Sequence, residues 1–145
     1  MTEMLQMAQR VLNAQPFSKL LNARMTDFSK ELSEIRLTVS DSLKQQQGFV
    51  HGGVISYLAD NALTFAGGAA LGSGVVTSEF KINYLRPVLG EEIVARAIAV
   101  HAGKSQAVCR CDLFTVDSSG AESLCAVAQG TIVAPAVRTA ATAAV

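Results

Sequence analysis

The alternation of apolar and polar positions changes its period along the chain, and each change marks a new element. Apolar residues recur at helical spacing over about 3–14 and Pro16 follows, which predicts a short amphipathic helix that ends before the proline. The stretch 31–39 alternates with a period of two, as a half-buried strand does, and 21–28 is interpreted as the strand before it. The polar stretch 41–48 then predicts a loop.

The longest apolar stretch predicts the main helix, at about 53–71. Apolar residues cover nearly its whole circumference, so we expect it to be buried on nearly all sides. Gly67 and Gly68 indicate either a closely packed neighbour or a nearby helix end. Four strand-like stretches follow, at 75–85, 92–101, 105–116 and 122–134, with turn residues between them.

This order of elements favours an α+β fold in which an antiparallel sheet wraps around one long central helix. The length of 145 residues and the lack of a linker predict a single domain, 1–145, with its core at about 17–135. The Ala- and Thr-rich tail from residue 134 onwards is expected to fray.

Charge and cysteine usage narrow the class of protein. The 12 basic and 12 acidic residues balance without a basic patch, so we expect no nucleic-acid partner. Asp60 and several glycines interrupt the apolar stretch, and the N-terminus lacks a secretory pattern, so we expect a cytoplasmic protein without a membrane span. The odd count of 3 cysteines predicts small, buried or half-buried apolar side chains rather than disulfides or a metal site.

The pair Gly52 and Gly53 stands where the main helix begins. The first N–H groups of a helix have no intrahelical partner, and the helix dipole adds partial positive charge there. Glycine lets a ligand approach this backbone, so the pair suits an oxygen that gains negative charge during a reaction. A tight turn without any ligand would explain the same two glycines.

Asp60 is the single acidic residue of the main helix. A carboxylate among apolar neighbours pairs with a cation, caps another group, or acts as a nucleophile or general base. No Lys or Arg lies within a helical turn of it, so any ion pair would be tertiary. Structural pairing and catalysis both remain open from these residues alone.

Three stretches together resemble one known family. They are GFVHGGVISYLAD at 48–60, FKINYLRP at 80–87 and GKS at 103–105. The chain is similar over about 20–134 to the hotdog-fold acyl-CoA thioesterases, closest to the phenylacetate-pathway branch of the 4-hydroxybenzoyl-CoA thioesterase superfamily. The resemblance implies hydrolysis of an acyl-CoA to free acid and coenzyme A, which is part of the substrate, with no separate cofactor.

The resemblance also implies roles for individual residues. Asp60 would be the nucleophile or the general base for water, and the Gly52 N–H would polarise the thioester carbonyl. His51 would support the loop near the thioester. Thr77 would orient water, with Ser78 as the alternative.

Further substrate contacts follow from the same resemblance. Gln45 stands at a position where relatives often carry an Asn that helps to hold the water or the substrate. Gln has the same amide group on a longer side chain and would take this role, with Gln46 or Gln47 as the alternative. Lys104 would meet a phosphate of CoA, although the sequence alone favours an ordinary solvated lysine in a turn. The remaining expected substrate contacts are Gly53, Asn61, Arg86 and Ser105.

Helix geometry predicts that one chain is not enough. Gly52 and Asp60 are eight residues apart, or ~12 Å along the helix axis, whereas attack requires contact within ~3–3.5 Å. The two groups that act together therefore come from different chains, which predicts a homodimer. The family resemblance agrees and adds a homotetramer as a possibility.

Two other functions remain as alternatives. A hotdog dehydratase or hydratase would use His51 and Asp60 as an acid–base pair on an acyl thioester. A non-catalytic acyl-CoA-binding protein is the second alternative. It remains open because Gln45 replaces the Asn that relatives often carry.

Overall fold

The computed structural model describes residues 1–136, and the elements follow one another as two helices, two strands, a long helix and four strands. They are α1 (Glu3–Ala14), α2 (Pro16–Leu20), β1 (Arg24–Phe28), β2 (Ser33–Thr38), the 3₁₀ turn Asp41–Leu43, α3 (Gly52–Leu71), β3 (Val76–Tyr84), β4 (Glu92–Ala102), β5 (Gln106–Val116) and β6 (Glu122–Val133). The tail expected to fray lies almost entirely outside the described residues.

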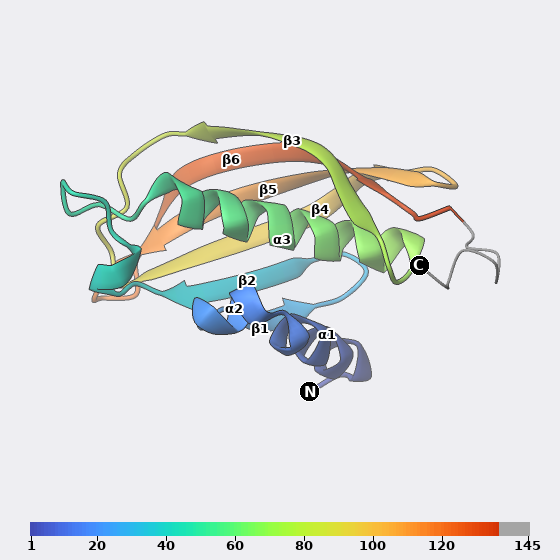
Figure 1. The fold of residues 1–145 in the computed structure, drawn as a ribbon, viewed down its shortest axis with the longest axis horizontal. Coiled ribbons are helices and arrows are strands. Elements are labelled where there is room, and N and C mark those ends of the chain that lie inside the picture. The colour runs from blue at the N-terminus through green and yellow to red at the C-terminus, as the bar shows by residue number, and fades with distance from the viewer. Residues whose placement is uncertain (137–145) are drawn as a thin grey trace.

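The six strands form one antiparallel sheet in the order β1-β2-β4-β5-β6-β3. Figure 1 shows α3 lying along one face of this curved sheet, while α1 and α2 lie beside the β1 edge. The predicted α+β fold, a sheet wrapped around a long central helix, is confirmed. No helix within residues 1–136 has the length and apolar character needed to cross a membrane.

Small side chains on the inner face of the sheet let α3 pack closely against it. Ala95 and Ala97 on β4 and Cys109 and Cys111 on β5 are fully buried. A Cβ on Gly67 would come within 2.5 Å of the Ile132 side chain on β6. Close packing therefore explains Gly67, the first of the two interpretations that its sequence context allowed.

The three cysteines are buried and free, as predicted. Burial raises the pKa of the Cys109 thiol to about 11 and that of Cys125 to about 11. Such thiols stay protonated at neutral pH and pack as small apolar groups.

The structure differs from the predictions around Pro16 and at the start of α3. Pro16 does not only end the first helix: it also starts α2, where its missing N–H costs nothing because a first-turn N–H has no partner. The strand expected from residue 21 consequently begins only at Arg24. Helix α3 begins one residue early, at Gly52, because His51 caps it.

The expectation that α3 is buried on nearly all sides is wrong for the single chain. Its face toward the sheet is buried, including Leu58, Ala62 and Leu63. The opposite face forms a half-exposed stripe of Val54, Tyr57, Asn61, Thr64 and Gly68, residues three or four positions apart. One sheet can cover only one side of a helix, so this stripe remains accessible.

Candidate active site

The N-terminus of α3 presents one backbone donor that the described residues leave free. His51 is the N-cap, and its Nδ1 accepts a hydrogen bond from the Gly53 N–H at 2.9 Å. Within residues 1–136 no hydrogen bond uses the Gly52 N–H. The two glycines thus differ, since Gly53 is held by the cap and Gly52 can donate to a ligand.

Tyr84, at the end of β3, holds this first turn in place. Its hydroxyl donates to the Gly52 carbonyl at 2.9 Å and lies 2.6 Å from the Ser56 hydroxyl. A Cβ on Gly52 would lie 3.2 Å from the Tyr84 ring, a tight contact. Glycine at this position therefore lets the aromatic ring pack directly on the helix start.

Asp60 lies in the middle of α3 and is only half-buried. Its Oδ1 accepts a hydrogen bond of 2.6 Å from the Thr77 hydroxyl. The Thr64 hydroxyl lies 2.9 Å from that of Thr77 and donates to the Asp60 carbonyl at 2.8 Å. No ion pair among residues 1–136 involves Asp60, so its tertiary partner is a hydroxyl group rather than a cation.

A bulge in β3 decides which hydroxyl reaches Asp60. Thr77 pairs with Ile132 and Glu79 pairs with Thr131, so Ser78 is an extra residue between the two pairs. An extra residue reverses the alternation of side chains beyond it. Thr77 consequently faces the helix together with Phe80, and Ser78 is exposed.

Asn61 points away from the Asp60 carboxylate and toward the start of α2. Its Nδ2 donates to the Gln15 side chain at 3.0 Å and to the Tyr57 hydroxyl at 3.1 Å. The Ser18 hydroxyl lies 3.3 Å away and is buried. In the single chain, Asn61 thus ties α3 to the α1–α2 junction.

Gln45 lies in the loop before α3 and bonds only locally within the described residues. Its Oε1 accepts from the Gln47 N–H, and its Nε2 lies 3.4 Å from the Gln47 side-chain oxygen. No hydrogen bond within residues 1–136 connects it to Asp60 or Thr77. One chain does not bring these predicted partners together.

The predicted CoA contacts lie at opposite ends of the sheet. Lys104 and Ser105 are exposed in the β4–β5 turn, and the next residue, Gln106, pairs with Val133 beside the start of β3. Arg86 follows the far end of β3 and is also exposed. A strand of 9 residues separates the two ends, which is roughly 30 Å at ~3.3 Å per residue.

Gly52 and Asp60 lie on one uninterrupted helix, as the spacing argument assumed. A helix is a rigid rod, so the ~12 Å rise between them cannot be closed within the chain. Within one chain, the Gly52 N–H and the Asp60 carboxylate therefore lie too far apart to contact the same atom of a ligand.

A family model described as "Thioesterase superfamily" matches residues 47–121, a range that includes Gly52 and Asp60. The chain belongs to this superfamily. A Haemophilus influenzae protein named "Putative esterase" is 30% identical over 114 residues, covering 77% of this chain and 80% of the relative.

Solved structures show the same fold. A thioesterase family protein from Silicibacter pomeroyi superposes with a TM-score of 0.80 at 28% identity, covering 88% of this chain and 95% of that one. The Escherichia coli PaaI protein from the phenylacetic acid degradation operon superposes at 0.76 with 20% identity, covering 92% and 97%. Together with the family match, these results identify the chain as a hotdog-fold thioester hydrolase.

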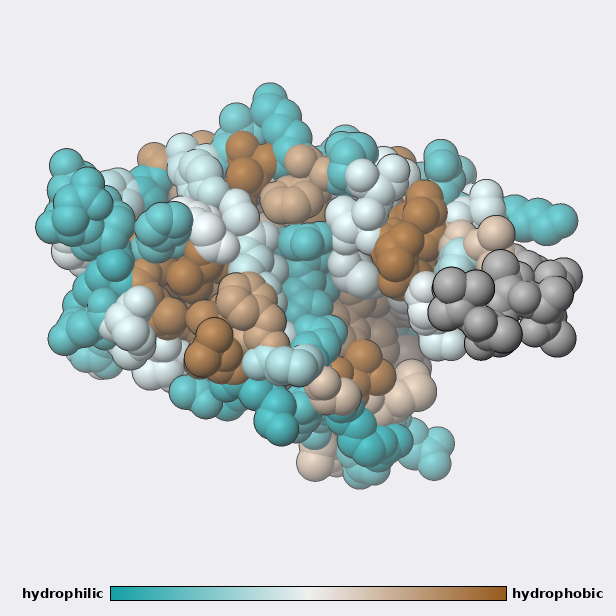
Figure 2. All heavy atoms as spheres, in the orientation of Figure 1, coloured by the Kyte–Doolittle hydropathy of each residue, from teal (hydrophilic) through white to brown (hydrophobic). Residues whose placement is uncertain are grey.

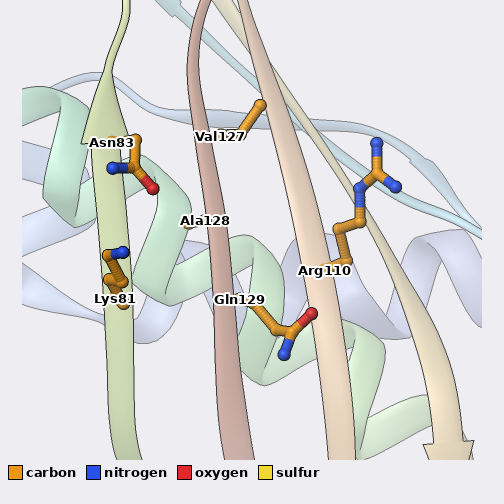
Figure 3. Close-up of a pocket in the computed structure, with 6 residues that line it drawn as sticks. All are labelled: Lys81, Asn83, Arg110, Val127, Ala128 and Gln129. Atoms are coloured by element: carbon orange, nitrogen blue, oxygen red, sulfur yellow. The ribbon is translucent and has the colours of Figure 1, made fainter.

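A separate hollow of about 280 Å³ lies over β3, β5 and β6. Figure 3 shows its lining side chains, among them Lys81, Asn83 and Arg110, with α3 behind the strands. None of the predicted site residues lines it. This hollow therefore lies apart from Asp60, Thr64 and Thr77, which we call the Asp60 cluster.

Two residues that contact the predicted site residues, Thr64 and Tyr84, were not identified from the sequence. Thr64 is four residues after Asp60, so helical spacing already placed it on the same face. Tyr84 had no comparable signal, because its contact with Gly52 depends on where β3 ends relative to α3. No cluster of three or more His, Cys, Asp or Glu in the described part of the chain could hold a metal ion.

Proposed function

We propose that this protein hydrolyses acyl-CoA thioesters at a site shared by two chains of a homodimer. The observation that carries the proposal is the distance between Gly52 and Asp60 along α3. A free Gly52 N–H lies at the helix start, and a carboxylate held by Thr77 lies ~12 Å further along the rod. Two antiparallel copies of α3 would bring the Gly52 of one chain to the Asp60 of the other.

The chemistry follows from these two groups. The Gly52 N–H donates to the thioester carbonyl oxygen, which gains negative charge as the carbon is attacked. Asp60 either attacks that carbon itself or removes a proton from the attacking water. The C–S bond then breaks, and CoA leaves as its thiolate and takes up a proton. If Asp60 acts as the base, the acyl group leaves directly as the free acid. If Asp60 acts as the nucleophile, the acyl group is first held as an anhydride on Asp60, which water hydrolyses to the free acid and the regenerated carboxylate.

The remaining predicted residues have supporting roles in this proposal. His51 caps α3 and so holds the Gly52 donor in place. Gln45 contributes its amide to the shared site, and Gly53 and Asn61 border it. Lys104, Ser105 and Arg86 meet the nucleotide end of CoA, with the two cations supplied from different chains because they lie at opposite ends of the sheet.

Two surfaces support a dimer. Strand β3 is an edge of the sheet and carries the exposed apolar residues Val76 and Tyr84, with Leu85 directly after it. An unpaired edge of this kind is a template for pairing with another strand. Pairing β3 with its copy would also bring the half-exposed stripes of two α3 helices toward each other, and such dimers can pair further into a tetramer.

The reduced, buried cysteines suit the reducing cytoplasm, where we place the protein. No nucleic acid or membrane takes part in the proposed reaction.

The direct test is release of free thiol from a panel of acyl-CoAs, with Asp60→Asn as the control. Asn is close in shape to Asp and leaves a group that can accept from Thr77, so it removes the charge without emptying the site. Thiol release by the wild type and its loss in Asp60→Asn support the proposal. Binding of acyl-CoA without any thiol release would favour the non-catalytic alternative, and a change in acyl unsaturation without thiol release would favour a dehydratase or hydratase.

A further inference from the structure

A groove of about 420 Å³ separates α1 from the second half of α3. Met4, Met7 and Val11 of α1 form one wall, and Phe65 and Ala69 of α3 form the other. Its volume is in the range of small-molecule sites, ~300–1,000 Å³. The face drawn in Figure 2 carries apolar surface near α1, α2 and the start of β3.

The groove lies open because of how α1 is supported. Helix α1 packs on β1 and α2, not along α3, so the two helices stay apart. Small residues at the end of α3 widen the space further. A Cβ on Gly68 would find no atom closer than 3.4 Å, in contrast to Gly67 on the packed face.

The walls favour an uncharged, apolar occupant. No Asp, Glu, Lys, Arg or His is among the residues that line the groove. Its two amide side chains, Gln15 and Asn61, bond to each other at 3.0 Å and thus offer fewer free polar groups. Methionine side chains such as Met4 and Met7 adapt to occupants of different shape.

Thr64 connects the groove to the proposed reaction centre. It lines the groove, and its hydroxyl lies 2.9 Å from that of Thr77, which donates to Asp60. An acyl chain whose thioester carbon is near Asp60 therefore has an apolar path past Thr64 toward α1.

We propose that this groove binds the acyl group of the substrate and that the α1 wall sets its size, which selects medium-length aliphatic or aryl acyl groups over acetyl. This inference rests on the proposed thioesterase function. The occupant is the apolar part of the thioester, because the groove is continuous with the Asp60 cluster through Thr64 and lacks charge.

Val11→Trp tests the wall by filling the groove from α1, where Val11 is 50% exposed and so can be enlarged. Asn13→Trp is the matched control, because Asn13 is exposed on the same helix and does not line the groove. We expect Val11→Trp to lower kcat/KM for decanoyl-CoA by ~10-fold or more and to leave acetyl-CoA within about twofold. Ala69→Leu, on the α3 wall, should shift the acyl preference in the same direction.

Equal losses on decanoyl-CoA and acetyl-CoA, or no change on either, would overturn the inference. Dissociation of the oligomer by Val11→Trp, measured by size-exclusion chromatography with light scattering, would also overturn the inference. It would show that a second copy of the chain, and not the acyl group, covers the groove.

A binding measurement separates failure of this inference from failure of the proposed function. The chain contains no Trp, so Met7→Trp places a single fluorophore in the groove and Asn13→Trp places one outside it. We expect the non-hydrolysable decanoyl-CoA thioether to shift the emission of Met7→Trp and not that of Asn13→Trp. A shift in both or in neither overturns the groove assignment, whether or not the wild type hydrolyses any thioester.

Discussion

The Thr77 hydroxyl donates a 2.6 Å hydrogen bond to the Asp60 carboxylate, and a one-residue bulge at Ser78 makes this contact possible. Without the extra residue, the alternation that turns Phe80 toward α3 would turn Ser78, and not Thr77, toward it. Two neighbouring hydroxyl residues therefore have different environments, and each serves as the control for the other.

We expect Thr77→Val to lower kcat by roughly 10- to 100-fold, because a hydrogen bond to a charged group contributes about 1.5–3 kcal/mol. Ser78→Ala should leave kcat within about twofold, since Ser78 is exposed. Steady-state thiol release by both variants measures the two values of kcat. Equal effects at the two positions would mean that the bulge does not orient the catalytic carboxylate.

Asp60→Ala should lower kcat by at least ~10³-fold, as removal of a nucleophile or base does in other hydrolases. The dimer should persist, because Asp60 makes no ion pair among the described residues and its carboxylate bonds to Thr77 of the same chain. Thiol release and light scattering on the same preparation measure both quantities. A variant that retains activity but unfolds at lower temperature would show that Asp60 is structural.

Mixed dimers test whether two chains share the site. We would prepare Asp60→Ala and His51→Ala separately and then unfold and refold them together. Random pairing makes about half of the dimers mixed, each with one intact site, so about a quarter of wild-type activity should return. A site within one chain would recover nothing, because every chain would still carry one of the two changes.

That experiment needs two nearly inactive starting proteins. His51→Ala removes the N-cap bond to Gly53, so its activity and helix content should be measured first. If it remains active, a bulky residue at Gly52 can replace it, because that position contacts the Tyr84 ring and faces the proposed ligand.

Lys104→Ala should raise KM for acyl-CoA by about 3- to 10-fold, as expected for loss of one exposed charge contact with a phosphate. The KM for the corresponding acyl-pantetheine should not change, since only CoA carries the 3′-phosphate nucleotide. Comparing the two substrates under identical salt conditions isolates the contact. An equal increase on both would remove Lys104 from the nucleotide site.

Glu34 gives the protein a pH-dependent contribution to stability that is independent of the active site. Its carboxylate bonds to Arg36 at 2.9 Å and to Arg96 at 2.6 Å. Burial raises the pKa of Glu34, but the hydrogen bonds from Arg36, Thr26 and Arg96 outweigh this effect and lower it from 4.5 to about 2. The ionised form is therefore favoured in the folded state.

Because the folded-state pKa is depressed, this contribution is fully present above pH 4.5 and is lost as the pH falls toward 2. In that window the unfolded chain binds the extra proton, so stability decreases by about 1.4 kcal/mol per pH unit from this group. Glu34→Gln should lower the free energy of unfolding by roughly 2 kcal/mol at pH 7 and flatten the acid slope. Urea titrations at several pH values measure both, with the exposed Glu31→Gln as a control whose slope should match wild type.

The sequence by itself determined the order of the strands and of the two longer helices, and it placed Gly52 and Asp60 along α3. Helical and alternating periods identified α1, α3 and β2 because burial on one side of an element imposes its own repeat on the sequence. The separation of Gly52 and Asp60 could also be derived in advance, since the rise of a helix does not depend on its surroundings.

Tertiary structure alone decided the features that depend on pairing between distant segments. The bulge that selects Thr77 over Ser78 exists only relative to β6. Tyr84 reaches Gly52, and Lys104 lies far from Arg86, because of strand register. The groove beside α3 depends on α1 packing against β1. No local pattern encodes these relationships, because register and packing depend on the fit between residues that are remote in the chain.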